Sequence, residues 1–100
     1  MTDERAGMRR RFIVRGRVQG VNFRNTAVDQ ARRLGLTGRV WNAADGSVEC
    51  IAEGTAEALD RFREWLGRGP RMAAVEQVET ADLEGDARYT EFRISLGSES

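Results

Sequence analysis

The sequence predicts an α+β domain in which two helices cover one face of a mostly antiparallel sheet. Segments in which polar and apolar residues alternate are interspersed with two segments whose apolar residues recur every three or four positions. The chain has 100 residues, 40% of them hydrophobic, which is enough for one compact core. Because each helical segment is apolar on one side only, both need a common apolar surface, and one face of a sheet provides it.

The first half of the predicted domain starts at residue 11, after a charged and flexible leader that we assign to residues 1–10. Residues 11–18 are apolar at first and then alternate with arginine, as in a half-buried strand. From Phe23 to Leu34 the apolar residues share one helical face, and Gly35 suits the end of this helix. Residues 36–41 and 48–53 predict a hairpin, in which Asp45-Gly46 forms the turn.

The second half begins with Thr55, which can cap a helix whose apolar face is formed by Leu59, Phe62, Trp65 and Leu66. Residues 72–78 give an irregular strand signal, residues 82–88 read as a loop, and residues 92–96 alternate again. The resulting order, with an extra short strand at the C-terminal end, is that of the ferredoxin-like βαββαβ sandwich, with two helices on one face of the sheet. We therefore predict a single domain over residues 11–97.

The composition excludes several kinds of catalytic site. The chain contains no histidine, and all sixteen basic residues are arginines. This excludes histidine general bases, Schiff-base lysines and the lysine of P-loops. Cys50 is the single cysteine, so it forms no intramolecular disulfide, and no metal site is expected. Because the alternation in residues 48–53 places Cys50 on the apolar face of a predicted strand, we expect it to be buried. No segment resembles a signal sequence or a membrane span, and we expect a cytoplasmic protein without a membrane partner.

The charges are distributed unevenly along the chain. Residues 1–40 hold ten arginines and three acidic residues, a net charge of +7, and residues 41–100 hold six arginines and thirteen acidic residues, a net charge of −7. Such asymmetry can create a positive field that attracts a small anion. Nucleic-acid binding is not expected, because Arg15, Arg17, Glu49 and Glu53 occupy strand positions where an RNA-binding sheet would present aromatic side chains.

Residues 16–24 form the candidate functional segment, a glycine-bearing loop that leads into a helix N-terminus. Unpaired backbone N–H groups at such a place can converge on an anion. Arg24 can add a full charge and two parallel hydrogen bonds to phosphate oxygens. An ordinary strand-to-helix turn, with Gly20 serving the backbone and Arg24 in solvent, explains the same spacing, and the spacing alone leaves both interpretations open.

Two motifs give the sequence a resemblance to a known family. Residues 16–24 read Gly-Arg-Val-Gln-Gly-Val-Asn-Phe-Arg, which resembles the first signature of the acylphosphatase family. Residues 38–48 match the second signature, Gly-x-Val-x-Asn-x-x-Asp-Gly-x-Val. Both motifs occur in order, and the resemblance extends over residues 11–96, well beyond what a lone motif would give.

This resemblance implies a hydrolase that acts on carboxylic-phosphoric anhydrides and releases a carboxylate and inorganic phosphate. It implies two catalytic residues, Arg24, which grips the phosphate, and Asn42, which positions the attacking water. It implies that the phosphate is also bound by the loop formed by Gln19, Gly20, Val21, Asn22, Phe23 and Arg24. No cofactor, metal or phosphoenzyme is implied, and the absent histidine fits, because a carboxylate leaves without needing protonation.

Three positions depart from the family pattern and leave the substrate preference open. Asn22 is polar at a variable position, where we expect it to stabilise the turn. Arg39 stands where the family often has an aromatic residue, and Trp41 stands where a polar residue is common. The sequence is compatible with three kinds of physiological acyl phosphate, namely a carboxylic-phosphoric anhydride of metabolism, carbamoyl phosphate and an acyl-phosphorylated protein.

One alternative to an enzyme is a non-catalytic module that binds an anion or an acyl phosphate. The presence of Asn42 beside Arg24 argues against it, because a simple phosphate binder needs no water-positioning amide. We expect a monomer that takes a small-molecule substrate.

Overall fold

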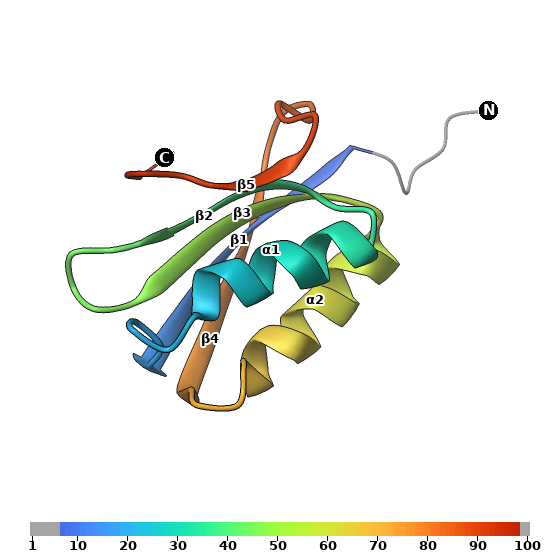
Figure 1. Ribbon diagram of the computed structural model, residues 1–100. Coiled ribbons are helices and arrows are strands. Elements are labelled where there is room, and N and C mark those ends of the chain that lie inside the picture. The colour runs from blue at the N-terminus through green and yellow to red at the C-terminus, as the bar shows by residue number, and fades with distance from the viewer. Residues whose placement is uncertain (1–6, 99–100) are drawn as a thin grey trace.

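The computed structural model of the chain describes residues 7–98 and contains one five-stranded sheet with two helices (Figure 1). The elements in order are β1 (Met8–Arg17), α1 (Phe23–Arg33), β2 (Thr37–Asn42), β3 (Val48–Gly54), α2 (Ala56–Arg68), β4 (Ala74–Leu83) and β5 (Phe92–Ile94). The strands lie in the order β4-β1-β3-β2-β5, and every pairing is antiparallel except that of β2 with β5. Both helices lie on the same face of the sheet (Figure 1), so the predicted ferredoxin-like α+β fold is confirmed.

The hydrophobic core lies between this face and the helices. The predicted helix faces supply its buried side chains, among them Phe23 and Ala27 of α1 and Phe62 of α2. The Phe62 ring lies edge-on to Phe12 of β1, at 5.7 Å between ring centroids, and to Phe92 of β5, at 5.8 Å. Aromatic pairs in this geometry add to the stabilisation from area burial. The short strand β5 is thus anchored in the core through Phe92.

The first strand begins earlier than the sequence predicted. Met8–Arg10, which we assigned to the leader, pair with β3 and with β4, and residues 1–6 of that leader lie outside the described residues. The charges of this segment are met by carboxylates on neighbouring elements: Arg9 pairs with Glu53 at 2.8 Å, and Arg10 pairs with Asp82 at 2.9 Å. A run that reads as charged and solvated is therefore part of the sheet. At the other end of the sheet, β4 continues to Leu83, where a loop was predicted from residue 82.

The sheet face away from the helices is partly covered by residues 84–91. Glu53 holds this segment, because its carboxylate accepts hydrogen bonds from two backbone N–H groups. Arg88 N donates to Oε2 at 2.9 Å, and Tyr89 N donates to Oε1 at 2.9 Å. Glu53 also accepts bonds from Arg9 and Thr37, and it is only 2% exposed. Burial alone would raise the pKa of Glu53, but these hydrogen bonds outweigh it and lower the pKa. The cover over Glu53 leads directly into β5.

Gly38 allows β2 to lie between β3 and β5. Its φ is +150°, and a Cβ atom placed on it would lie 1.9 Å from the carbonyl oxygen of Ile51. Any side chain here would push the two strands apart, which only glycine avoids. On its other side β2 pairs in parallel with β5, which places Val40 opposite Ile94.

No helix within residues 7–98 is long and apolar enough to cross a membrane.

Candidate active site

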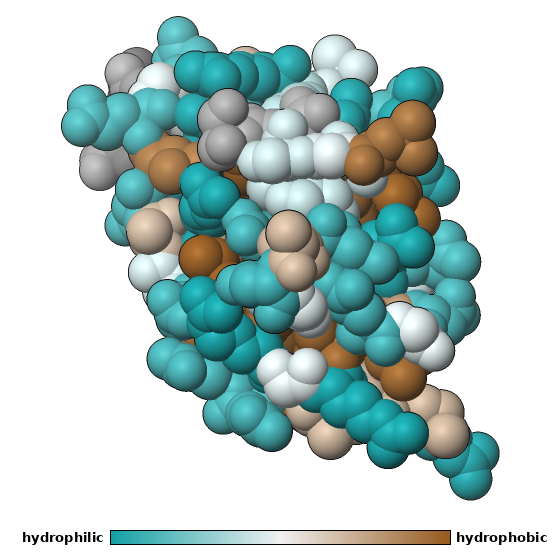
Figure 2. All heavy atoms as spheres, turned by 90° about the vertical axis from the view of Figure 1, so that its left-hand side faces the viewer, coloured by the Kyte–Doolittle hydropathy of each residue, from teal (hydrophilic) through white to brown (hydrophobic). Residues whose placement is uncertain are grey.

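A small cavity lies at the end of the molecule where β1 ends, α1 begins and the β2–β3 hairpin turns, at the left of Figure 1. Its volume is about 100 Å³, several times the roughly 10–15 Å³ that one water needs. Arg24 and Asn42, the two predicted catalytic residues, line it together. Its other lining residues are Val18, Gly20, Asn22, Phe23, Asn25 and Ile94. Figure 2, which faces this end, shows a mostly hydrophilic surface with separate hydrophobic patches.

Asn42 reaches the cavity because of its place on β2. Alternate residues of a strand point to the same face, and Val40, two residues earlier, is fully buried under the helices. Asn42 is the last residue of the strand, so its side chain lies on the same side but beyond the core. Its Oδ1 atom is buried and has no hydrogen-bond partner in the part of the chain that the structure describes. A buried acceptor left without a partner costs about 1–3 kcal/mol, so this atom is suited to a ligand or a water.

The loop between β1 and α1 turns sharply beside the cavity. Gly20 has φ +76° and Asn22 has φ +63°, whereas Val21 between them does not have a positive φ. Asparagine tolerates the left-handed conformation better than most residues do. The two left-handed residues therefore curve the loop at the two positions, Gly20 and Asn22, that line the cavity.

Asn22 stabilises the turn, as expected. Its side-chain Oδ1 accepts a hydrogen bond from Asn25 Nδ2 at 2.8 Å. Its carbonyl oxygen accepts a bond from the Thr26 hydroxyl at 2.7 Å. The Asn22 side chain forms no capping bond to the backbone of α1. The first N–H groups of α1 are consequently not occupied by the residue that precedes the helix.

The two helices differ at their N-termini. Helix α2 has the usual features: the Thr55 hydroxyl accepts a hydrogen bond from Ala58 N at 3.1 Å, and Glu57 lies in the first turn. Helix α1 has neither a side-chain cap nor an acidic residue in its first turn. A helix N-terminus carries a partial positive charge and unpaired N–H donors. In α1 neither is met by a side chain of the first turn, and its first residues, Phe23 and Arg24, line the cavity.

Arg24 is the one partly buried arginine within residues 7–98 that has no acceptor for its guanidinium. The other partly or fully buried arginines all bond to a carboxylate or a carbonyl, namely Arg9, Arg10, Arg11, Arg15 and Arg39. The Arg24 guanidinium is therefore available to a ligand in the cavity that this residue lines.

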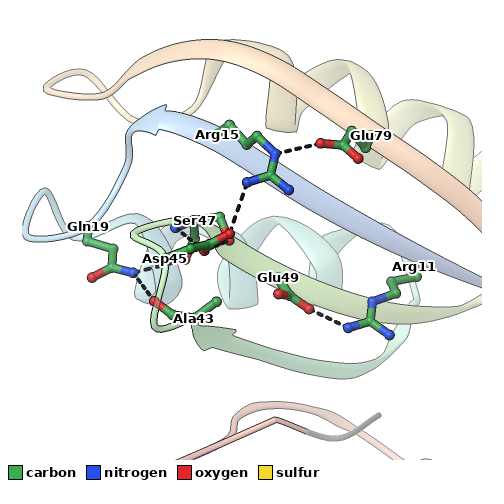
Figure 3. Close-up of polar contacts among 8 residues, drawn as sticks. All are labelled: Arg11, Arg15, Gln19, Ala43, Asp45, Ser47, Glu49 and Glu79. Atoms are coloured by element: carbon green, nitrogen blue, oxygen red, sulfur yellow. Dashed lines mark hydrogen bonds and ion pairs between the residues drawn. The ribbon is translucent and has the colours of Figure 1, made fainter.

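Two members of the predicted phosphate loop do not line the cavity. Val21 is partly buried against the core. The side-chain Nε2 of Gln19 donates to the carbonyl oxygens of Ala43, at 2.8 Å, and of Ser47, at 2.9 Å (Figure 3). These bonds tie the loop to the β2–β3 hairpin. The Gln19 side chain thus fixes the position of the loop relative to the hairpin and is not free to contact a ligand.

Asp45 orders the turn of that hairpin. Its Oδ1 accepts hydrogen bonds from the Ser47 hydroxyl, at 2.6 Å, and from Ser47 N, at 3.0 Å. Its Oδ2 pairs with Arg15 at 3.0 Å, and Arg15 also pairs with Glu79 of β4 (Figure 3). The bonds from Ser47 and then from Arg15 lower the pKa of Asp45 to about 2. Asp45 is therefore a charged acceptor that shapes the turn, and it does not line the cavity.

Cys50 is fully buried, and burial raises the pKa of its thiol, which makes it unreactive. Among the described residues, no group of three or more His, Cys, Asp or Glu side chains could hold a metal ion.

The sequence analysis missed three residues of the cavity, Val18, Asn25 and Ile94. Asn25 follows Arg24 directly and could have been found by extending the motif, whereas Ile94 enters through the β2–β5 pairing, in which it lies opposite Val40.

Residues 10–94 match the sequence profile of the acylphosphatase family. The chain belongs to the acylphosphatase family. An acylphosphatase of Bordetella parapertussis is 45% identical over 80 residues, which cover 80% of this chain and 85% of the relative. The structure of an acylphosphatase from Coxiella burnetii matches 94% of this chain and 100% of its own, with 33% identity and a TM-score of 0.86. That of an acylphosphatase from Bacillus subtilis matches 89% of this chain and 99% of its own, with 35% identity and the same TM-score. Family, relatives and fold together support an acyl phosphate hydrolase.

Proposed function

We propose that this member of the acylphosphatase family hydrolyses acyl phosphates by direct attack of a water on the phosphorus atom. Arg24 and the backbone N–H groups of the loop hold the phosphate, and Asn42 orients the water. The observation that carries this proposal is that Arg24 and Asn42 line the same small cavity, where the buried Asn42 Oδ1 and the Arg24 guanidinium both lack a partner within residues 7–98.

The phosphate is held by three kinds of positive charge at one place. These are the guanidinium of Arg24, the N–H groups of the loop around Gly20, and the uncapped N-terminus of α1. The backbone N–H groups are fixed by the fold before the substrate arrives, so they need no reorganisation when charge develops on the phosphate oxygens. One preorganised donor at such a site stabilises a transition state by about 3 kcal/mol.

Asn42 positions the water. Its Oδ1 accepts a hydrogen bond from the water, and its amide Nδ2 can donate to an oxygen nearby. A water held at attacking distance has already lost the freedom that the reaction would otherwise remove. Its oxygen forms a bond to phosphorus while the bond from phosphorus to the acyl oxygen breaks. The carboxylate departs with the electron pair, one proton of the water moves to a phosphate oxygen, and the other stays on the new hydroxyl of inorganic phosphate.

This chemistry fits a chain without histidine. A carboxylate is a stable leaving group, so the step requires no general acid, and charge stabilisation with positioning is sufficient. The proposal includes no cofactor and no covalent phosphoenzyme. We further propose that the chain acts as a cytoplasmic monomer formed by one domain, in which the single cysteine, Cys50, is buried and free.

The test is the hydrolysis of benzoyl phosphate by the purified, chelator-treated protein and by folded Arg24→Ala and Asn42→Ala variants. Loss of one preorganised donor lowers kcat by about 10²–10³-fold, and we expect losses of this order for both variants. Arg24→Ala should also weaken inhibition by inorganic phosphate, whereas Asn42→Ala should leave that inhibition nearly unchanged. Arg33→Ala is the matched control, because Arg33 lies on the same helix but is exposed and paired with Asp29.

A folded wild-type protein that binds phosphate but hydrolyses no acyl phosphate would refute the catalytic proposal and favour the non-catalytic binding module. Equal activity of wild type and Asn42→Ala would show that the water is positioned by another group.

A further inference from the structure

A second and larger hollow adjoins the phosphate cavity and has no role in the mechanism above. Its volume is about 480 Å³, within the usual range of ligand sites. It is lined by Asn25, Val28, Asp29, Arg32, Arg93 and Ile94, and we call it the α1–β5 groove. Asn25 and Ile94 line both hollows, so a molecule whose phosphate fills the first cavity would extend into the second.

The groove has one wall from each of two elements. Asn25, Val28 and Arg32 lie three or four residues apart, so they share one face of α1. The opposite wall is formed by β5, where Ile94 is 37% exposed although it is a large hydrophobic residue. Val28 packs against the core from the α1 side. The inner part of the groove is therefore apolar and begins next to the phosphate cavity.

The charged side chains that line the groove differ in whether they already have a partner. Asp29 pairs with Arg33 at 3.2 Å, and Arg93 pairs with Glu91. Arg32 donates through Nε to the carbonyl oxygen of Phe92 at 3.1 Å, and its two terminal nitrogens have no acceptor among the described residues. The groove thus offers one guanidinium whose terminal nitrogens are contacted by no carboxylate of the described residues.

The residues that line the two hollows include more positive than negative charges. Arg24, Arg32 and Arg93 line them against one carboxylate, that of Asp29, which pairs with Arg33. Glu91 lies near this edge and is bound by Arg93, and this bond, followed by the charges of Arg32 and Arg39, lowers the pKa of Glu91.

We propose that the α1–β5 groove binds the acyl group of the substrate, and that Arg32 makes the enzyme prefer acyl phosphates whose acyl group carries a second negative charge. This inference rests on the proposed function, since it assigns the part of the substrate that the phosphate cavity does not hold. The apolar body of the acyl group packs against Ile94 and Val28, and the distal anion accepts hydrogen bonds from the terminal nitrogens of Arg32.

The test compares 4-carboxybenzoyl phosphate with 4-carbamoylbenzoyl phosphate, two substrates of equal shape that differ in one charge. The ratio of their kcat/KM values cancels the contribution of the phosphate cavity, which is common to both. We expect the wild type to prefer the carboxylate by about two- to fivefold, the range of exposed ion pairs, and to lose this preference as salt is added. Arg32→Gln should bring the ratio close to one, and Arg32→Lys should retain part of the preference.

Arg61→Gln on α2 removes the same charge from an exposed position outside the groove and should leave the ratio unchanged. Equal use of both substrates by the wild type would overturn the inference while leaving acyl phosphate hydrolysis intact. A uniform loss with both substrates in Arg32→Gln would overturn it as well, because Arg32 would then act only by holding β5 through Phe92. Hydrolysis of neither substrate would refute the proposed function itself.

Discussion

Replacement of Glu53 by alanine should destabilise the protein more than any other single change of a charged side chain in the described sheet. Its carboxylate pairs with Arg9 Nε at 2.8 Å, and the two side chains are 1% and 4% exposed. It also binds the N–H groups of Arg88 and Tyr89. The variant leaves the Arg9 guanidinium buried without its carboxylate and removes the acceptor that binds the backbone of Arg88 and Tyr89. Breaking a buried pair from one side costs about 3–5 kcal/mol, against a typical total stability of about 5–15 kcal/mol.

The assay is urea denaturation followed by circular dichroism, with Glu49→Ala as the matched control. Glu49 lies on the same strand and pairs with Arg11, but these side chains are 15% and 29% exposed, so its loss should cost about 1 kcal/mol or less. Arg9→Met should cost less than Glu53→Ala, because Glu53 keeps its two backbone partners. A loss below about 1 kcal/mol in Glu53→Ala would refute the reasoning, since the carboxylate would then not hold this part of the fold.

Two further predictions concern the site and its hairpin. Asn42→Ala should leave the melting temperature unchanged or raise it by a few degrees while activity falls, because the variant removes a buried acceptor that has no partner. A clear decrease of the melting temperature in thermal scans would contradict this. Asp45, whose folded pKa of about 2 lies below its ordinary value of 3.8, contributes stability above pH 4 that is lost as the pH falls toward 2. Asp45→Asn should therefore be less stable than wild type at pH 7 and lose less stability between pH 4 and pH 2. Equal slopes of unfolding free energy against pH in this window would show that Asp45 is not held by Ser47 and Arg15.

The sequence was sufficient for the features that depend on local patterns. Both helix faces, the Asp45-Gly46 turn and a strand over residues 36–41 follow from periodicity and turn chemistry, and the structure contains all of them, with the strand at Thr37–Asn42. The two motifs also indicated which loop and which strand end would form the site. Arg24 and Asn42 do line one cavity, although their roles stay predictions.

Features that depend on tertiary contacts could not be read from the sequence. Arg9 looked like part of a solvated leader because its partner, Glu53, lies 44 residues away. Ile94 looked like an ordinary alternating strand residue, and only the parallel pairing of β5 with β2 brings it to the cavity. Gln19 was assigned to the phosphate loop through its backbone N–H group, and no local pattern indicated that its side chain would bond to the hairpin. In each case the deciding partner is remote in the chain, and local propensity carries no information about it.

The parallel pairing of β5 with β2 has a consequence for how the protein acquires activity. It joins Gly38 to Phe92 and supplies the cavity wall at Ile94, so the site is complete only when the last strand of the described chain has paired. This strand contributes only three residues to the sheet. Without their pairing the two helices and the antiparallel strands would stay in place, but the cavity would be open on the side of Ile94. The short edge strand therefore makes ligand binding depend on three residues at the C-terminal end of the sheet.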